Sequence, residues 1–297
     1  MLSSPRSFAQ IDVFTAQSGM GNPVAVVLDS ADLDDVTMQR FARWTNLSET
    51  TFVLPPTDPR ADYRLRIFTP DSEIPFAGHP TLGSCHAWLA AGGTPKSLGR
   101  IVQQCAKGLI DIRKDGKRLA FAAPPCQHSE PLPAVLTQVA QAIGVNAAQV
   151  LRALVLDNGP VFITLQLDSA STVLALEPDY AQLTRLRQNV GVVGRYSYGQ
   201  TRLPPAQSNR AADAGEPLVE VRAFAPLMGI NEDPITGSLN ASLAQWLIES
   251  GELPDRYVAA QGSALGRAGR VHVERDAQGQ VWVGGNSVTV IRGEAML

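Results

Sequence analysis

Residues 73–84 read Glu-Ile-Pro-Phe-Ala-Gly-His-Pro-Thr-Leu-Gly-Ser, and residues 232–238 read Glu-Asp-Pro-Ile-Thr-Gly-Ser. Each stretch follows a segment of strand composition that ends at a proline, residues 65–70 in the first half and 219–226 in the second. Equivalent residues lie 156 positions apart before the two turns and 159 apart within them, as one short loop insertion would produce. The sequence therefore predicts an internal duplication of strand, proline turn, acidic residue, glycine turn and helix.

Each glycine turn opens an apolar segment with helical spacing. Residues 81–91 are apolar on most sides, which predicts a buried helix, and Pro80 suits the first helical position because its missing N–H costs nothing there. Apolar residues recur at helical spacing in the second half as well: Leu239, Leu243, Trp246 and Leu247. Because a helix start presents unpaired N–H groups and partial positive charge, the two turns predict two sites for an anionic group.

Composition narrows the class of protein. The chain has 297 residues, 44% of them hydrophobic and 18% charged, with a formal net charge of -3, which is ordinary for a globular protein and argues against nucleic acid or an anionic membrane as a partner. No apolar run reaches the roughly 20 residues of a membrane span, and residues 1–10 lack the apolar core of a secretory signal. The three cysteines show neither close pairing nor metal-ligand spacing, which favours a cytoplasmic protein without a metal.

The division into domains follows from one proline-rich segment. Residues 123–133 contain four prolines, and both flanking halves are β-rich around one or two helices, which predicts an α+β protein. We expect an N-terminal domain at 1–125 and a C-terminal domain at 126–297, whose last strand can pack back on the first domain. Residues 201–217 are polar and proline-bearing, which predicts a loop that could cover a site.

Four segments, at residues 21–26, 48–53, 76–83 and 232–238, together resemble the signatures of the phenazine-biosynthesis isomerase family, the PhzF-like proteins. They occur in the family's order and span most of the chain. The resemblance implies a diaminopimelate epimerase-like fold of two similar domains, each a β-barrel-like mixed sheet wrapped around a central helix, with the active site in the cleft between them. It also implies a homodimer and catalysis without a cofactor or metal.

The resemblance also implies roles for individual residues. Glu49 matches the glutamate that moves a proton between carbon atoms, as general base and then acid. His79 and Asp233 match residues that orient the substrate and handle protons. The remaining matches are to substrate-binding positions: Gly78, Gly237 and Ser238.

The chemistry of the residues agrees with this assignment. Proton abstraction from carbon needs a base whose pKa lies near the working pH, and burial raises the pKa of a glutamate above its usual value of about 4.3. Glu49 lies at the entrance of a predicted strand at residues 50–54, beside Leu47, Phe52 and Val53, so desolvation is expected. The helix starts supply donors for the charge left on the substrate. We therefore expect an isomerase acting on a small carboxylated, anionic metabolite.

Two alternatives remain open at this stage. A two-base epimerase or racemase would use Glu49 and Asp233 as opposed bases and would invert a chiral centre. Related amino-acid epimerases use two cysteines at the helix-start turns, and neither turn here contains one, so thiol chemistry is disfavoured. A non-catalytic metabolite-binding protein of the same fold would bind its ligand without turnover, even after Glu49→Gln.

Some residues of the duplicated turns have a structural interpretation. Asp233 could cap its own helix. Glu73 and Glu232 occur in both turns, which predicts a shared structural role, and Arg66 and Arg222 could pair with carboxylates inside each domain.

Overall fold

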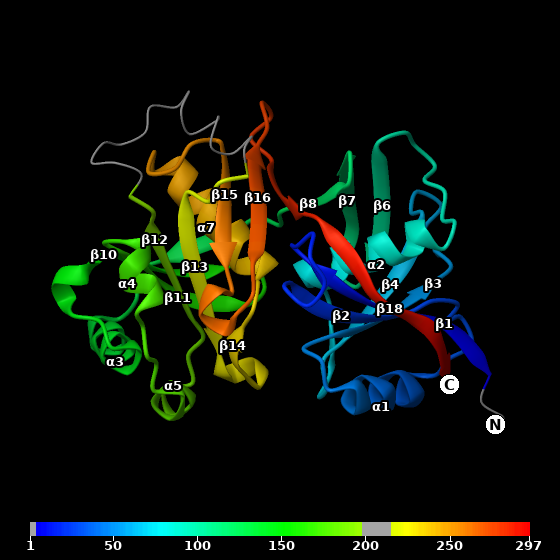
Figure 1. Ribbon diagram of the computed structural model, residues 1–297, viewed down its shortest axis with the longest axis horizontal. Helices are drawn as coiled ribbons and strands as arrows, with labels where there is room; N and C mark the ends of the chain where they lie inside the picture. Colours follow the sequence, from blue (N-terminus) through cyan, green and yellow to red (C-terminus); the bar gives the residue numbers. More distant parts are fainter. Residues whose placement is uncertain (1–3, 198–214) are drawn as a thin grey trace. The chain divides into compact units, whose positions relative to one another are not determined.

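The computed structural model describes residues 4–197 and 215–297. The chain forms two compact units: unit 1 comprises Met1–Ala122 and Gly284–Leu297, and unit 2 comprises Ala123–Val283 (Figure 1). The change of unit therefore lies at the start of the proline-rich segment 123–133. The loop expected at 201–217 lies, as far as residue 214, outside the described residues.

Unit 1 is a mixed sheet with two helices. Its strands are β1 (Pro5–Val13), β2 (Asn22–Val27), β3 (Thr50–Leu54), β4 (Tyr63–Phe68), β5 (Glu73–Ile74), β6 (Arg100–Cys105), β7 (Gly108–Asp115), β8 (Arg118–Ala122) and β18 (Ser287–Met296). Its helices are α1 (Asp35–Thr45) and α2 (Gly78–Ala90). The predicted strand at residues 50–54 is confirmed as β3.

Helix α2 is the central helix of unit 1. It contacts β1, β2, β3, β4, β8 and β18, and its first eight residues are all buried. A Cβ atom at Gly83 would lie 2.4 Å from Cγ1 of Val24, so this glycine allows the helix to approach β2 closely. Helix α1 packs on β3 and β4 instead, and buries Met38 and Ala42.

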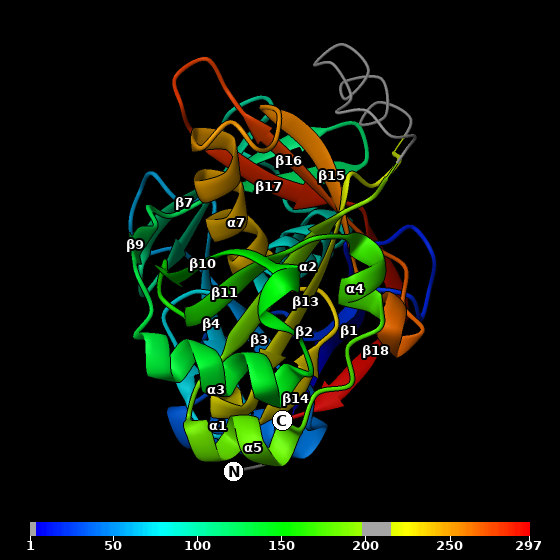
Figure 2. The same cartoon turned by 90° about the vertical axis from the view of Figure 1, so that its left-hand side faces the viewer.

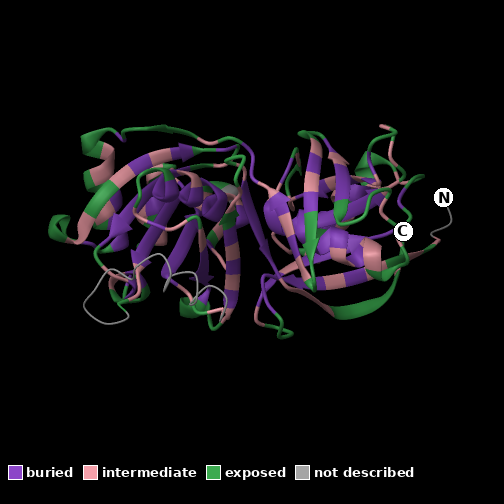
Figure 3. Cartoon of the chain, turned by 90° about the horizontal axis from the view of Figure 1, so that it is seen from above, coloured by how far each residue is buried: buried purple, intermediate pink, exposed green. Residues whose placement is uncertain are grey.

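Unit 2 is built in the same way with more helices. Its strands are β9 (Gln127–Ser129), β10 (Val150–Asp157), β11 (Val161–Leu167), β12 (Val190–Arg195), β13 (Val219–Ala225), β14 (Ile230–Asp233), β15 (Arg256–Gln261), β16 (Gly269–Arg275) and β17 (Val281–Gly285), the last of which runs into unit 1. Its helices are α3 (Pro133–Ile143), α4 (Ala170–Leu174), α5 (Tyr180–Leu186) and α7 (Gly237–Glu249), with short 3₁₀ turns η1 (Ala147–Gln149), η2 (Pro226–Met228) and η3 (Ser263–Leu265). Helices α3 and α5 lie side by side (Figure 2). Helix α7 is the buried one, and buried residues concentrate inside each unit (Figure 3).

Strand pairing repeats between the units, which confirms the predicted duplication and the α+β class. Antiparallel β1–β2, parallel β2–β3, antiparallel β3–β4 and parallel β4–β6 correspond to β10–β11, β11–β12, β12–β13 and β13–β15, with the same directions. The central helices α2 and α7 follow β5 and β14, the corresponding short strands.

The last strand of each repeat pairs with the first strand of the other repeat. Strand β9 follows the first repeat and pairs with β10, whereas β18 follows the second repeat and pairs with β1. This exchange places Gly284–Leu297 in unit 1, although these residues end the stretch 126–297 that the sequence predicts as the second domain.

The duplicated arginine and glutamate residues pair with each other, which confirms their structural role. Arg66 donates to both carboxylate oxygens of Glu73, at 2.8 and 2.6 Å. Arg222 donates to both oxygens of Glu232 in the same way, at 2.9 and 2.8 Å. Each ion pair joins the long strand to the short strand that leads to the central helix.

None of the helices in the described part of the chain is long and apolar enough to cross a membrane.

Candidate active site

Glu49 and His79, which lie far apart in the sequence, meet inside unit 1. Glu49 precedes the first residue of β3, and His79 is the second residue of α2. The hydroxyl groups of Thr51 and Ser84 lie 2.8 Å apart and tie the beginning of β3 to the same helix. Oε2 of Glu49 consequently lies 3.3 Å from Nε2 of His79.

Burial gives Glu49 the acidity that a general base needs. Only 5% of Glu49 and 4% of His79 is exposed. Burial raises the pKa of Glu49 to about 7, and a hydrogen bond with Ser48 opposes part of this rise. Oε2 of Glu49 meets no hydrogen-bond geometry with the described residues, although Nε2 of His79 lies 3.3 Å from it. A carboxyl group in this state can both accept and return a proton near neutral pH.

Asn22 lies on the other side of the His79 ring. It is the first residue of β2, and its Nδ2 is 3.3 Å from Nδ1 of His79. Asn22 was not among the predicted site residues, although it belongs to the segment 21–26 that carries the family resemblance. Its contact with His79 depends on how β2 pairs in the sheet, which the spacing of residues in the sequence does not reveal.

The start of α2 provides backbone donors beside this pair. The helix begins at Gly78, so Pro80 is its third residue and not its first, and its missing N–H still falls within the first turn, where N–H groups have no partner inside the helix. Ala77, the N-cap residue, provides no side-chain acceptor. The first-turn N–H groups are therefore of the kind that binds an anionic ligand group.

The predicted residues of unit 2 form a second group at the start of α7. Asp233 ends β14, and Gly237 and Ser238 are the first two residues of the helix. The N-cap residue is Thr236, so the suggestion that Asp233 caps the helix is wrong. The Thr236 hydroxyl instead donates to Oδ2 of Asp233 at 2.6 Å, and the carbonyl of Ser238 accepts from Asn158 at 2.9 Å.

In each unit, a buried glutamine on the strand that follows the central helix forms hydrogen bonds at the beginning of that helix. Gln261 of β15 accepts from the N–H of Thr236 at 3.0 Å and donates to the carbonyl of Asp233 at 3.2 Å. Gln103 of β6 occupies the corresponding strand in unit 1 and donates to Oγ1 of Thr81 at 3.0 Å. Sequence reasoning missed both residues, although their separation nearly matches that of the duplicated turns.

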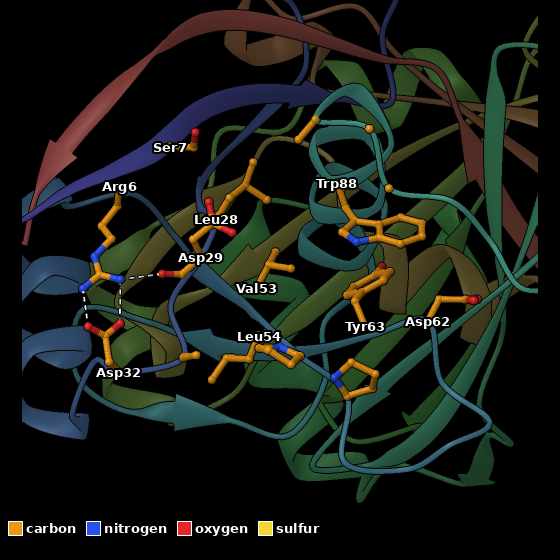
Figure 4. A pocket seen from close by; sticks show the side chains of 16 residues that line it. Arg6, Ser7, Leu28, Asp29, Asp32, Val53, Leu54, Asp62, Tyr63 and Trp88 are labelled. Atoms are coloured by element: carbon orange, nitrogen blue, oxygen red, sulfur yellow. Dashed lines mark hydrogen bonds and ion pairs between the residues drawn. The ribbon is translucent and has the colours of Figure 1, made fainter.

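A pocket of about 640 Å³ lies in unit 1 away from the Glu49–His79 pair (Figure 4). Val53 and Leu54, at the far end of β3 from Glu49, line it together with Trp88 near the end of α2. At its edge Arg6 forms a bidentate ion pair with Asp32, at 2.6 and 2.7 Å (Figure 4). The pocket therefore lies near the ends of β3 and α2, whereas Glu49 and His79 lie at the beginnings of these two elements.

Among the residues that the structure describes, no three His, Cys, Asp or Glu side chains gather in a group that could hold a metal ion.

Two units that repeat one strand order around an enclosed helix define the diaminopimelate epimerase-like class of α+β proteins. A family model described as "Phenazine biosynthesis-like protein" matches residues 11–293. The chain therefore belongs to this family, PhzF in short.

Individual relatives are similar to this protein over almost its whole length. Antisense-enhancing sequence 1 of Schizosaccharomyces pombe is 36% identical over 98% of this chain and 99% of its own. The trans-2,3-dihydro-3-hydroxyanthranilate isomerase of Pseudomonas aeruginosa is 32% identical over 98% of this chain and 99% of its own. The crystal structure of the Bacillus anthracis phenazine biosynthesis protein of the PhzF family matches with a TM-score of 0.81 at 20% identity, covering 99% of this chain and 100% of that one. The protein is an isomerase of this family.

Proposed function

We propose that the protein is a cofactor-independent isomerase that transfers a proton between carbon atoms of a small carboxylated metabolite, with Glu49 as the base. The observation that carries this proposal is the buried Glu49, whose pKa is raised to about 7 and whose Oε2 lies 3.3 Å from His79. The name of the Pseudomonas aeruginosa relative, an isomerase of a hydroxyanthranilate, supports a substrate that carries a carboxylate.

The reaction needs only one acid–base group. The Glu49 carboxylate removes a proton from carbon, so that an O–H bond forms while the C–H bond breaks. The electron pair that remains shifts the substrate's double bond. Glu49 then returns the proton to another carbon on the same face, which regenerates the carboxylate without any oxidation or reduction. His79, beside Oε2, orients the carboxylate and the substrate.

The family resemblance supports roles for the other candidate residues. We assign Gly78 and Gly237, each with its first-turn N–H group, to substrate binding, and assign Asp233 and Ser238 to substrate orientation. The supporting feature is the turn before α7, which Gln261 and Thr236 hold in place by hydrogen bonds. Because Oδ2 of Asp233 already accepts the Thr236 hydroxyl, it is less suited to act as the second base of an epimerase.

We also infer a cytoplasmic homodimer that acts without nucleic acid or a membrane. Support comes from the family resemblance, the net charge of -3 and three free cysteines. Light scattering on the purified protein tests the dimer directly.

The decisive experiment compares the wild type with Glu49→Gln in heavy water. The first substrate to try is trans-2,3-dihydro-3-hydroxyanthranilate, followed by a pool of small carboxylated metabolites. Mass spectrometry follows changes in retention and the gain of one deuteron. Glu249→Gln, at the exposed end of α7, is the matched control.

We expect wild type and control to form the same product, and Glu49→Gln to lose about 10²- to 10⁴-fold in rate. Equal rates for all three proteins would eliminate Glu49 as the base. Inversion of a chiral centre would favour the two-base epimerase, and ligand binding without turnover by the wild type would favour a binding protein.

A further inference from the structure

Three buried side chains lie in a row at the beginning of α2. The amide of Asn22 faces Nδ1 of His79 at 3.3 Å, and Nε2 of the same ring faces Glu49 at 3.3 Å. Asn22 is 0% exposed, and the other two residues are each more than nine-tenths buried. The imidazole ring is therefore placed between an amide and a carboxylate, away from water.

The position of Asn22 is fixed by the turn before it. The buried carboxylate of Asp12 accepts hydrogen bonds from the N–H groups of Gly19, at 2.5 Å, and Gly21, at 3.4 Å. Gly21 leaves no room for a side chain, because a Cβ atom would lie 2.5 Å from the carbonyl oxygen of Val13. Asn22 then pairs with Val13 as the first residue of β2. The amide consequently reaches His79 from a closed turn and a paired strand.

A neutral imidazole has one nitrogen that donates and one that accepts, and the hydrogen bond at one nitrogen decides which tautomer is present. Nδ2 of Asn22 is a donor only. When it donates to Nδ1, the ring hydrogen must lie on Nε2, the nitrogen that lies 3.3 Å from Oε2 of Glu49. The opposite tautomer would place two lone pairs, one on Nε2 and one on Oε2, at the 3.3 Å contact.

We propose that Asn22 is a positioning residue that keeps the ring hydrogen of His79 on Nε2, the nitrogen beside Glu49. The proposal rests on the proposed function, since it assigns Asn22 to the orientation of the proposed base. Asn22 would act through His79 and not on the substrate. A purely structural amide would not decide the tautomer of His79, whereas the proposed role fixes which ring nitrogen carries the hydrogen.

The direct test is nitrogen NMR of the histidine rings in the full-length protein. The signal of His79 is identified by its loss in His79→Gln. In the wild type we expect Nε2 of His79 to carry the hydrogen and Nδ1 to be unprotonated. A wild-type ring with its hydrogen on Nδ1 would overturn the proposal, whatever happens to any variant.

The variant Asn22→Asp adds a second, opposite prediction. A carboxylate at this position accepts and does not donate, so we expect the hydrogen of His79 to appear on Nδ1. With the substrate found for the wild type, kcat should fall about 10- to 100-fold, with a smaller change in KM. The matched control is Asn189→Asp, which alters another buried amide, in unit 2, and should leave the His79 ring unchanged.

An unchanged tautomer in a folded Asn22→Asp protein would contradict the proposal. If that variant does not fold, the wild-type spectrum alone still decides. The result is separate from the proposed function, because the NMR readout needs no turnover: a fully active Glu49→Gln would reject the base but not the tautomer.

Discussion

In the proposed mechanism, Glu49 favours the reaction at the expense of stability. In the folded protein, burial raises the pKa of Glu49 to about 7, from about 4.5 for a solvent-exposed glutamate. Below about pH 4.5 both folded and unfolded chains bind the proton. As the pH rises from there towards 7, the unfolded chain releases its proton first, so the free energy of unfolding falls, and above pH 7 the loss is complete.

We therefore predict that Glu49→Gln is more stable than the wild type at high pH only. The shift corresponds to about 3 kcal/mol at pH 8.5, and the difference should fall to about 0.4 kcal/mol at pH 4.5. Urea unfolding followed by fluorescence at both pH values measures it. Glu249→Gln, at the exposed end of α7, is the control. An equal effect of Glu49→Gln at both pH values would mean that the glutamate ionises normally in the folded chain.

The same pKa predicts how the rate depends on pH. A general base must be ionised in the free enzyme, so kcat/KM should rise tenfold per pH unit below about 7 and level off above it. A flat profile between about pH 5.5 and 8.5 would exclude a base with this acidity.

The candidate residues of unit 1 were predictable only in part. Glu49 and His79 belong to segments with a family resemblance, and an apolar neighbourhood is visible around the glutamate in the sequence. The contact of Asn22 with His79 was not predictable, because it depends on the pairing of β2 and on the closure of the turn by Asp12. Polar contacts between residues of three different elements follow no regular spacing in the sequence, so the sequence alone does not reveal them.

At the level of elements, the two ion pairs differ in burial although they occupy equivalent turns. The side chains of Arg222 and Glu232 are 4% and 3% exposed, whereas those of Arg66 and Glu73 are 14% and 37% exposed. Arg222 also donates to the carbonyls of Val173 and Leu176. Removing the charge of Glu232 therefore leaves a buried arginine without its counter-ion.

We predict that Glu232→Gln lowers the free energy of unfolding by about 3–5 kcal/mol, as for other broken buried pairs. The matched change Glu73→Gln should cost about 1 kcal/mol or less, because water reaches that pair and Asp35 still contacts Arg66. Denaturant unfolding of both variants provides the comparison. Equal losses would show that burial does not distinguish the two turns.

The approach of α2 to the sheet gives another prediction for an element. Gly83→Ala would place a methyl group 2.4 Å from Cγ1 of Val24 and 3.0 Å from Cγ2 of Val13. Since neither strand can move without breaking its pairing, we expect a loss of about 1–3 kcal/mol in unfolding experiments. Gly293→Ala in β18 is the control, because nothing lies within 4 Å of its added Cβ atom. A Gly83→Ala protein as stable as this control would contradict the packing described.

Long and strongly patterned elements were predicted well, and short ones were not. Both central helices followed from the apolar segments after the glycine turns, although α2 begins at Gly78, before the predicted position. Strand β9 has only three residues, all exposed, within a proline-rich segment, so it carries no alternation that could predict it. It forms because β10 offers a partner.

At the level of the whole molecule, the exchange of final strands means that neither repeat completes its own sheet. Unit 1 needs β18 from the end of the chain, which pairs with β1 from Pro5 to Val13. Unit 2 in turn takes β9 from the end of the first repeat. The duplication was readable from the turns, and the sequence analysis expected that the last strand can pack back on the first domain. The pairing of β9 with β10 and the register of β18 on β1 were not readable, because pairing between distant strands depends on the folded sheet.

This arrangement predicts what a minimal unit 1 requires. Residues 4–122 alone would leave β1 without one of its partners and should not unfold cooperatively. Ser4 and Leu297 lie side by side, since the N–H of Ser4 donates to the carbonyl of Leu297 at 2.8 Å and the reverse bond is 3.1 Å. Because this is the geometry of a hairpin, a short glycine linker from Leu297 to Ser4 can join residues 284–297 to 4–122 in one fragment.

We predict that the joined fragment unfolds cooperatively in urea and protects the amides of β1 from hydrogen exchange, whereas residues 4–122 do neither. A joined fragment with residues 287–296 in scrambled order is the control for chain length and composition. If residues 4–122 alone proved as stable as the joined fragment, β18 would be dispensable, and the returning strand would not be what completes unit 1. A joined fragment no better than its scrambled control would contradict the pairing of β18 with β1, because the order of residues 287–296, which specifies the register, is the only difference between the two chains.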